Sequence, residues 1–102
     1  MNEHQAHSLE RFEAFYAWIE DAIADEDADL VSELVASRDD ALQDLLHAFS
    51  GRHLPEAARA RIEGAEAHVR GRLVRFYDSI LVRLSEERRM SYATARYQEA
   101  LP

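Results

Sequence analysis

The side chains that could do chemistry in this 102-residue chain are carboxylates, arginines and five histidines, because the sequence contains no cysteine. Asp44 and His47 stand three residues apart, as do His4 and His7. A di-iron site in a helical bundle needs inward-facing Glu-x-x-His pairs on two helices and two further glutamates. The chain has no Glu-x-x-His, and Asp44 and His47 fall on the polar side of their predicted helix. We therefore expect solvated histidines, no metal site and no cofactor.

A second pair, Arg61 and His68, has the spacing found in the Arg-and-His motif of a family of four-helix RNases. In that family a polar residue usually follows the arginine, whereas Ile62 follows it here. The chain shows no Ser-His-Asp order, no glycine-rich phosphate loop and no paired-carboxylate motif. We therefore expect no catalytic residues and a protein that is not an enzyme. An RNase is the weakest of the three functional hypotheses; the other two follow below.

Arg38 is the least expected polar residue, because helical spacing places it in the middle of an apolar face among Leu34, Leu42 and Leu45. Burying an unpaired guanidinium would be costly. The side chain must therefore either lay its methylene stem over the leucines or meet a carboxylate of another helix. The candidate acids are Glu20, Glu66 and Glu87. Arg38 is thus a structural or a recognition residue, and the sequence leaves both open.

Apolar residues recur at helical spacing along the whole chain without the alternation of a β-strand, so the sequence predicts an all-α fold. Helices are expected over about residues 8–24, 28–49 and 55–89. Seven apolar residues share one face of the first helix: Leu9, Phe12, Phe15, Tyr16, Ile19, Ala22 and Ile23. Ser8 is a suitable N-cap for the first helix, and an acidic break at 25–27 separates it from the second. Gly51 is expected to stop the second helix, and Pro55 suits the first turn of the third.

The C-terminal segment again shows helical spacing, which predicts a short fourth helix or a continuation of the third with a bend near 89–91. The spaced residues are Met90, Ala93, Tyr97 and Leu101. Together the elements predict one domain over 1–102, an antiparallel bundle of three main helices with a long third helix and a short C-terminal one. Residues 1–7 are expected to be frayed. Gly64 and Gly71 are seven residues apart and so lie on the same side of the third helix. Two explanations stay open: another helix approaches closely there, or the glycines are tolerated on an exposed surface.

The third helix carries more apolar surface than one neighbour requires, because its stripe widens over residues 73–84. An amphipathic helix of a partner could use this surface. The contact candidates are Leu73, Tyr77, Ile80, Leu81, Leu84 and Tyr97. Trp18 in the first helix and Tyr92 and Tyr97 near the C-terminus each admit two interpretations, packing at the edge of the core or contact with a partner.

The net charge of −8 is unevenly distributed: residues 1–50 carry −11 and residues 51–102 carry +3. An acidic domain is poorly suited to direct nucleic-acid binding. The asymmetry suggests that the two halves lie against each other or against a partner of opposite sign. The polar N-terminus is not a signal peptide and no apolar run approaches the ~18 residues of a membrane span, so we expect no membrane contact.

The pattern Leu34-x3-Arg38-x3-Leu42-x2-Leu45 resembles that of the FliT-type flagellar export chaperones. Further similarities are the acidic turn before it, the Leu54-Pro55-Glu56 restart, the long third helix, Tyr16-Ala17-Trp18 and the closing Ala93-x3-Tyr97. The resemblance covers about residues 12–100 and rests on helical periodicity with a few placed residues. The chain departs from the family in having no lysine, since all twelve basic residues are arginine.

The resemblance implies a small cytoplasmic helical protein that binds the C-terminal region of the filament-cap protein and delivers it to the export apparatus. Some members also contact the export ATPase, or restrain a flagellar transcription regulator by binding the protein and not DNA. Members have been seen as dimers, so a homodimer is an open alternative. The competing hypothesis is an unrelated small acidic regulatory or antitoxin-like helical protein that neutralises a basic partner.

Overall fold

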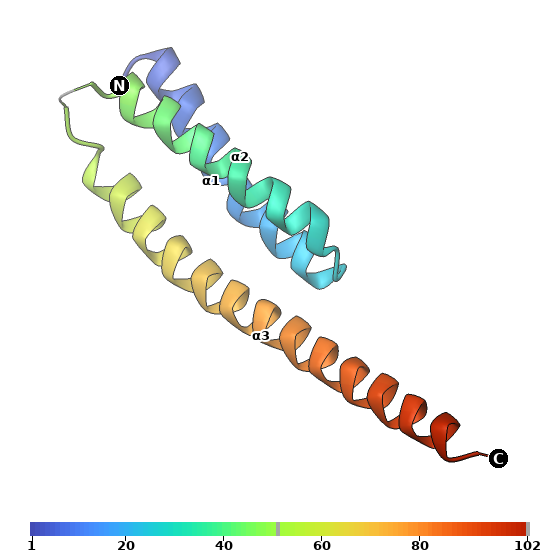
Figure 1. Ribbon diagram of the computed structural model, residues 1–102. Helices are drawn as coiled ribbons and strands as arrows, with labels where there is room; N and C mark the ends of the chain where they lie inside the picture. The colour runs from blue at the N-terminus through green and yellow to red at the C-terminus, as the bar shows by residue number, and fades with distance from the viewer. Residues whose placement is uncertain (51, 102) are drawn as a thin grey trace. The chain divides into compact units, whose positions relative to one another are not determined.

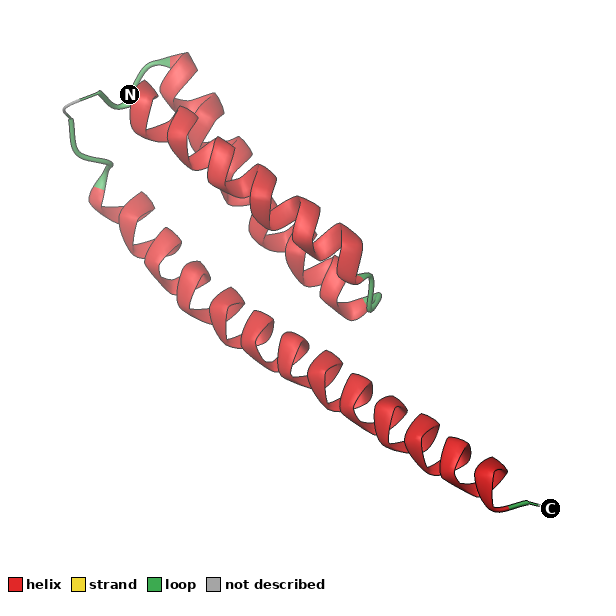
Figure 2. Cartoon of the chain, viewed as in Figure 1, coloured by secondary structure: helices red, strands yellow, loops and turns green. Residues whose placement is uncertain are grey.

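The computed structural model describes residues 1–50 and 52–101 and contains three helices, with no strand among these residues (Figures 1 and 2). The helices are α1 (Glu3–Ala24), α2 (Ala28–Ala48) and α3 (Glu56–Ala100). The predicted all-α fold is confirmed. The chain divides into two compact units, residues 1–72 and 73–102. The helix stop predicted at Gly51 lies outside the described residues; α2 itself ends at Ala48.

Helix α1 begins at Glu3, five residues earlier than predicted, so Ser8 is not its N-cap. The N-cap is Asn2, whose side chain accepts a hydrogen bond from the Gln5 backbone at 2.8 Å, while the Gln5 side chain accepts one from the Asn2 backbone at 3.0 Å. This reciprocal capping box satisfies two amides that would otherwise lack partners. The side-chain amide of Gln5 also donates a hydrogen bond, from Nε2 to the Ala48 carbonyl at 3.2 Å. This bond connects the start of α1 to the end of α2.

The acidic break predicted at 25–27 is confirmed and forms the turn between α1 and α2. Asp27 caps α2, because its side chain accepts a hydrogen bond from the Leu30 backbone at 3.1 Å. Glu26 has a φ of 55°, in the left-handed region that non-glycine residues rarely occupy. After this turn α2 returns beside α1, so the two helices form an antiparallel hairpin (Figure 1).

Apolar side chains of α1 and α2 fill the core of the hairpin. All seven residues predicted for the α1 face are buried: Leu9, Phe12, Phe15, Tyr16, Ile19, Ala22 and Ile23. On α2, Val31, Ala41 and Leu45 are buried, whereas Leu34 and Leu42 are half-buried. The core therefore lies where the helical periodicity of the sequence places it.

Helix α3 is one continuous helix of 45 residues, so the predicted short C-terminal helix is not a separate element. The helical spacing that begins again at Met90 therefore belongs to α3 itself, which is the alternative of a continued third helix. Residues 85–100 contain no glycine or proline, and nothing in them interrupts the backbone hydrogen bonds. At the other end, Pro55 directly precedes the helix and its carbonyl accepts from the Arg59 backbone at 2.9 Å.

The part of α3 within the first unit, residues 56–72, has a buried face that includes Ala58 and Val69. On its other side, Gly64 and Gly71 have nothing within 4 Å of the position a Cβ would take. The closely approaching helix that could have explained the two glycines is therefore not present in the described residues. None of the described helices combines the length and apolar character that crossing a membrane requires.

Candidate functional site

Arg38 of α2 forms an ion pair and a hydrogen bond with Glu66 of α3, through its Nη2 atom and the Oε2 atom of the carboxylate. Its Nη1 atom donates to Asp39 at 3.2 Å. The arginine side chain is only 15% exposed. Among the three acids that the sequence offered as partners, Glu66 is the one that Arg38 meets.

Two aromatic rings of α1 cover the guanidinium of Arg38. Its central carbon lies 5.4 Å from the ring centroid of Phe12 and 5.6 Å from that of Tyr16, distances at which cation–π attraction operates. The Tyr16 hydroxyl donates a 2.6 Å hydrogen bond to the same Glu66 oxygen that Arg38 contacts. Tyr16, Arg38 and Glu66, here called the Arg38 cluster, thus join one residue from each of the three helices.

The electrostatics of the cluster favour a neutral tyrosine and a charged pair. Burial, and next the hydrogen bond to Glu66, raise the pKa of Tyr16 to about 12. Burial tends to raise the pKa of Glu66, but hydrogen bonds from Tyr16 and Arg38 outweigh it and leave that pKa below its ordinary value. Burial tends to lower the pKa of Arg38, and its interactions with Tyr16 and Glu66 reverse this and raise it. The cluster therefore holds a fixed ion pair and joins the helices.

The other two candidate acids for Arg38 lie elsewhere. Glu20 contacts His68, with 2.6 Å between its buried Oε1 atom and the His68 Nε2 atom. This contact is a hydrogen bond only when Nε2 carries a proton, because a bare imidazole nitrogen cannot donate. Glu87 is exposed on the second unit.

Arg61, the other residue of the suggested RNase pair, contacts a second α1 carboxylate. Its Nη2 and Nε atoms donate to the two oxygens of Glu13 at 2.9 and 3.3 Å, and these hydrogen bonds raise the pKa of Arg61. Glu13 and Glu20 stand seven residues apart, as do Arg61 and His68, so α1 and α3 run in the same direction here. Both members of the pair therefore face carboxylates of α1.

The hairpin brings together the two pairs of residues that are spaced three apart, His4 with His7 and Asp44 with His47. His4 and His7 of α1 line a pocket of about 180 Å³ with Asp44 and His47 of α2. Arg11 also lines this pocket and forms an ion pair with Asp44, with 3.1 Å between Nη1 and Oδ2. Over residues 1–50 and 52–101, no group of three or more histidine and acidic side chains has the geometry to hold a metal ion.

The residues predicted to bind a partner lie on α3 and differ in exposure. Tyr77, Leu81, Leu84 and Tyr97 are exposed, whereas Leu73 and Ile80 are half-buried. Tyr97 is 16 residues beyond Leu81, which at 100° per residue places the two about 160° apart around the helix. A single partner helix therefore cannot contact both. We call Leu73, Tyr77, Ile80, Leu81 and Leu84 the α3 apolar face and treat Tyr97 apart from it.

Trp18 of α1 was expected either to pack at the edge of the core or to contact a partner. Its ring meets that of Phe15 edge to face, with 5.1 Å between the centroids and 83° between the planes. The side chain nevertheless remains 48% exposed. Packing at the edge of the core is therefore present, and contact with a partner stays a prediction.

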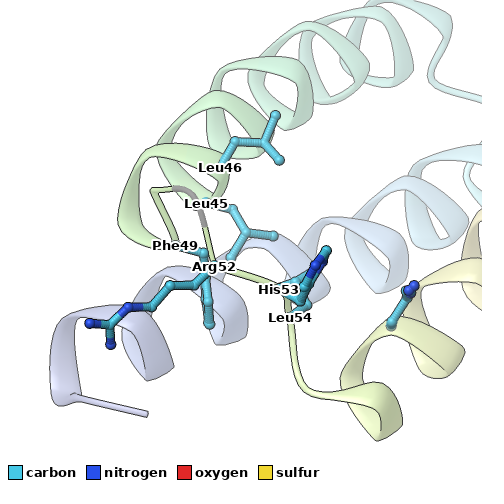
Figure 3. A pocket seen from close by; sticks show the side chains of 7 residues that line it. Leu45, Leu46, Phe49, Arg52, His53 and Leu54 are labelled. Atoms are coloured by element: carbon cyan, nitrogen blue, oxygen red, sulfur yellow. The ribbon is translucent and has the colours of Figure 1, made fainter.

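A pocket that the sequence analysis missed lies where α2 ends and the linker leads to α3 (Figure 3). Its volume is about 320 Å³. Arg52 and His53, which line it, belong to the linker, where helical periodicity carries no information about neighbours. One sequence feature does indicate this pocket: apolar residues precede the predicted helix break, and the basic residues Arg52 and His53 follow it directly.

Comparisons of the chain with protein-family models, with curated proteins and with solved structures find no match.

Proposed function

We propose that the protein is a FliT-type flagellar export chaperone that binds the C-terminal region of the filament-cap protein through the α3 apolar face. The observation that carries this proposal is the exposure of Tyr77, Leu81 and Leu84 on a segment that has no second helix within its own unit. Large apolar side chains left together on a surface mark a site of interaction. The pattern around Arg38 and the long third helix support the family assignment by resemblance.

The binding mode that fits this face is a helix laid along a helix. An amphipathic segment of the cap protein would place its apolar residues between Tyr77 and Leu84, which lie seven residues, or two turns, apart. Fully burying one such side chain contributes about 1.5–3 kcal/mol, so three or four side chains supply the driving force for a specific complex. While bound, the apolar surface of the cap protein is unavailable for assembly.

In this proposal Arg38 is a structural residue and not a recognition residue. Its guanidinium is covered by Phe12 and Tyr16 and paired with Glu66, which leaves little of it for a partner. The Arg38 cluster would fix α2 and residues 56–72 of α3 around α1 in an antiparallel three-helix bundle. The bundle would then serve as the base from which residues 73–100 are presented.

The proposal places the protein in the cytoplasm, where the cap protein is made and held before export. The export ATPase or a flagellar regulator would be further partners, bound as proteins without direct contact to nucleic acid. A homodimer through the same α3 face would compete with the cap protein. The protein would bind no cofactor and catalyse no reaction.

The second candidate function is an acidic regulator that neutralises a basic partner such as a toxin. The observation in its favour is the row of exposed acids along α2, within a half of the chain that carries −11. The acids are Asp29, Glu33, Asp40 and Asp44. Binding of this kind would weaken steeply as salt rises, because it rests on exposed charges.

Co-purification with the C-terminal region of the cap protein tests the first function against the second. The export chaperone is expected to retain the cap segment at both low and high salt, since apolar burial drives binding. Failure to retain it under conditions in which both proteins are soluble would contradict the proposal. Retention that disappears in 0.5 M salt would favour the acidic regulator.

A further inference from the structure

The pocket at the junction of α2 and α3 combines an apolar lining with basic side chains. The lining residues are Leu45, Leu46, Phe49, Arg52, His53, Leu54 and Arg59. Figure 3 shows Leu45 and Leu46 coming from the last turn of α2, Phe49 directly after it, and Arg52, His53 and Leu54 coming from the linker. The volume of about 320 Å³ lies at the low end for binding pockets, so it suits one large side chain and not a long acyl chain.

The charge of this lining is opposite to that of the chain. Two arginines and a histidine line the pocket and no acid does, although the protein as a whole carries −8. Within residues 1–50 and 52–101, the side chains of Arg52 and Arg59 form no ion pair and no hydrogen bond. Two acids, Glu56 and Glu63, line a separate hollow that shares Arg59 with this pocket.

We propose that this pocket binds an acidic peptide segment of a partner protein, one in which a large apolar side chain stands next to a carboxylate. The apolar side chain would enter between Leu45, Phe49 and Leu54, and the carboxylate would meet the guanidinium of Arg52 or Arg59. Arginine suits this role because its planar fork donates two parallel hydrogen bonds to one carboxylate. The site uses residues of the first unit alone, so it does not depend on the α3 apolar face or on the proposed function.

A fluorescently labelled peptide with a central phenylalanine between two aspartates is the probe, and fluorescence anisotropy measures its binding to the full chain. Replacing the aspartates by asparagine, or the phenylalanine by serine, is expected to weaken binding at least tenfold. Equal binding of the asparagine peptide would overturn the proposal, since the arginines would then recognise no charge. Displacement of the peptide by decanoate at a lower concentration than by unlabelled peptide would also overturn it in favour of a fatty acid.

The test variant is Arg52→Gln with Arg59→Gln, which removes both pocket charges. The control is Arg75→Gln, which makes the same kind of substitution once, at an exposed position that does not line the pocket. The double variant is expected to weaken peptide binding tenfold or more, roughly what the loss of one charged hydrogen bond represents. Arg75→Gln should leave binding unchanged. Undiminished binding by the double variant would contradict the proposal.

A measurement on the unaltered chain covers the case in which the double variant does not fold. Titration with the peptide should shift the backbone amide resonances of residues 45–49, 52–54 and 56–59 before all others. Shifts confined to other parts of the chain would overturn the proposal.

Discussion

Arg38 of α2 and Tyr16 of α1 share one oxygen of the Glu66 carboxylate, so a single acid of α3 receives hydrogen bonds from both other helices. Tyr16 and Arg38 also contact each other directly, with the guanidinium carbon 5.6 Å from the ring centroid. Each of the three side chains therefore depends on the other two for its hydrogen bonds or its charge.

Removing the arginine alone should destabilise the protein. Arg38→Met leaves Glu66, whose side chain is 30% exposed, with Arg70 at 3.8 Å as its remaining cationic neighbour among the described residues. We expect a loss of about 1–3 kcal/mol in the free energy of unfolding. Arg38→Met combined with Glu66→Met should recover most of that loss, because the charge that then loses its carboxylate is that of Arg70, whose side chain is 74% exposed to water. Urea denaturation measures both. A single variant as stable as the parent would mean that the ion pair contributes nothing to the fold.

The Tyr16 phenol should make the protein lose stability in alkali. Its pKa is raised from 10.0 to about 12 in the folded chain, so the folded state keeps a proton that the unfolded state releases between these values. The contribution of Tyr16 to the free energy of unfolding is therefore constant below pH 10 and falls as pH rises toward 12, by an amount on the order of 2 kcal/mol. Tyr16→Phe should reduce this slope; an unchanged slope would show that Tyr16 does not cause it.

The Glu66 carboxylate should make the protein lose stability in acid. Its folded pKa lies below the ordinary value of 4.5, so the unfolded chain takes up the proton first as pH falls. The stabilisation is complete above pH 4.5 and is lost as pH falls through the folded pKa. Thermal unfolding followed from pH 6 downward should show a smaller acid-dependent loss in Glu66→Gln. Identical acid profiles for the variant and the parent would contradict this role.

Replacing either glycine of α3 by alanine should stabilise the helix. At Gly64 and Gly71 an added Cβ meets nothing within 4 Å, and alanine is favoured over glycine in a helix by about 1 kcal/mol. Gly64→Ala and Gly71→Ala are thus each expected to raise the free energy of unfolding by up to about 1 kcal/mol. A loss of stability in either variant would reveal a close contact at that position.

The sequence predicted the elements whose positions follow from local periodicity. Each α1 residue assigned to the core is buried, from Leu9 to Ile23, because a 3.6-residue repeat determines which side of a helix faces its neighbour. The break at 25–27 was also predictable, since consecutive acids suit the start of a helix better than its interior.

Features that depend on distant contacts or on competing local signals were predicted less well. Periodicity placed Arg38 within the core but could not choose among Glu20, Glu66 and Glu87, because that choice depends on how the helices are placed in three dimensions. Ser8, which directly precedes the apolar repeat, was predicted as the N-cap, yet the capping box formed by Asn2 and Gln5 extends the helix outward. The pocket lined by Arg52 was not predicted, because the positions of linker residues do not follow a helical repeat.

The most direct test of the proposed function is the affinity of the cap protein's C-terminal region for two variants of α3, measured by calorimetry. Tyr77→Glu with Leu81→Glu places charges on the α3 apolar face, whereas Val82→Glu alters an exposed residue about 100° away from Leu81 and about 140° away from Tyr77. Circular dichroism establishes that each variant retains the helical signal of the parent. We expect the double variant to stay helical and lose binding, and Val82→Glu to bind as the parent does. A helical double variant that binds the cap segment with undiminished affinity would contradict the account.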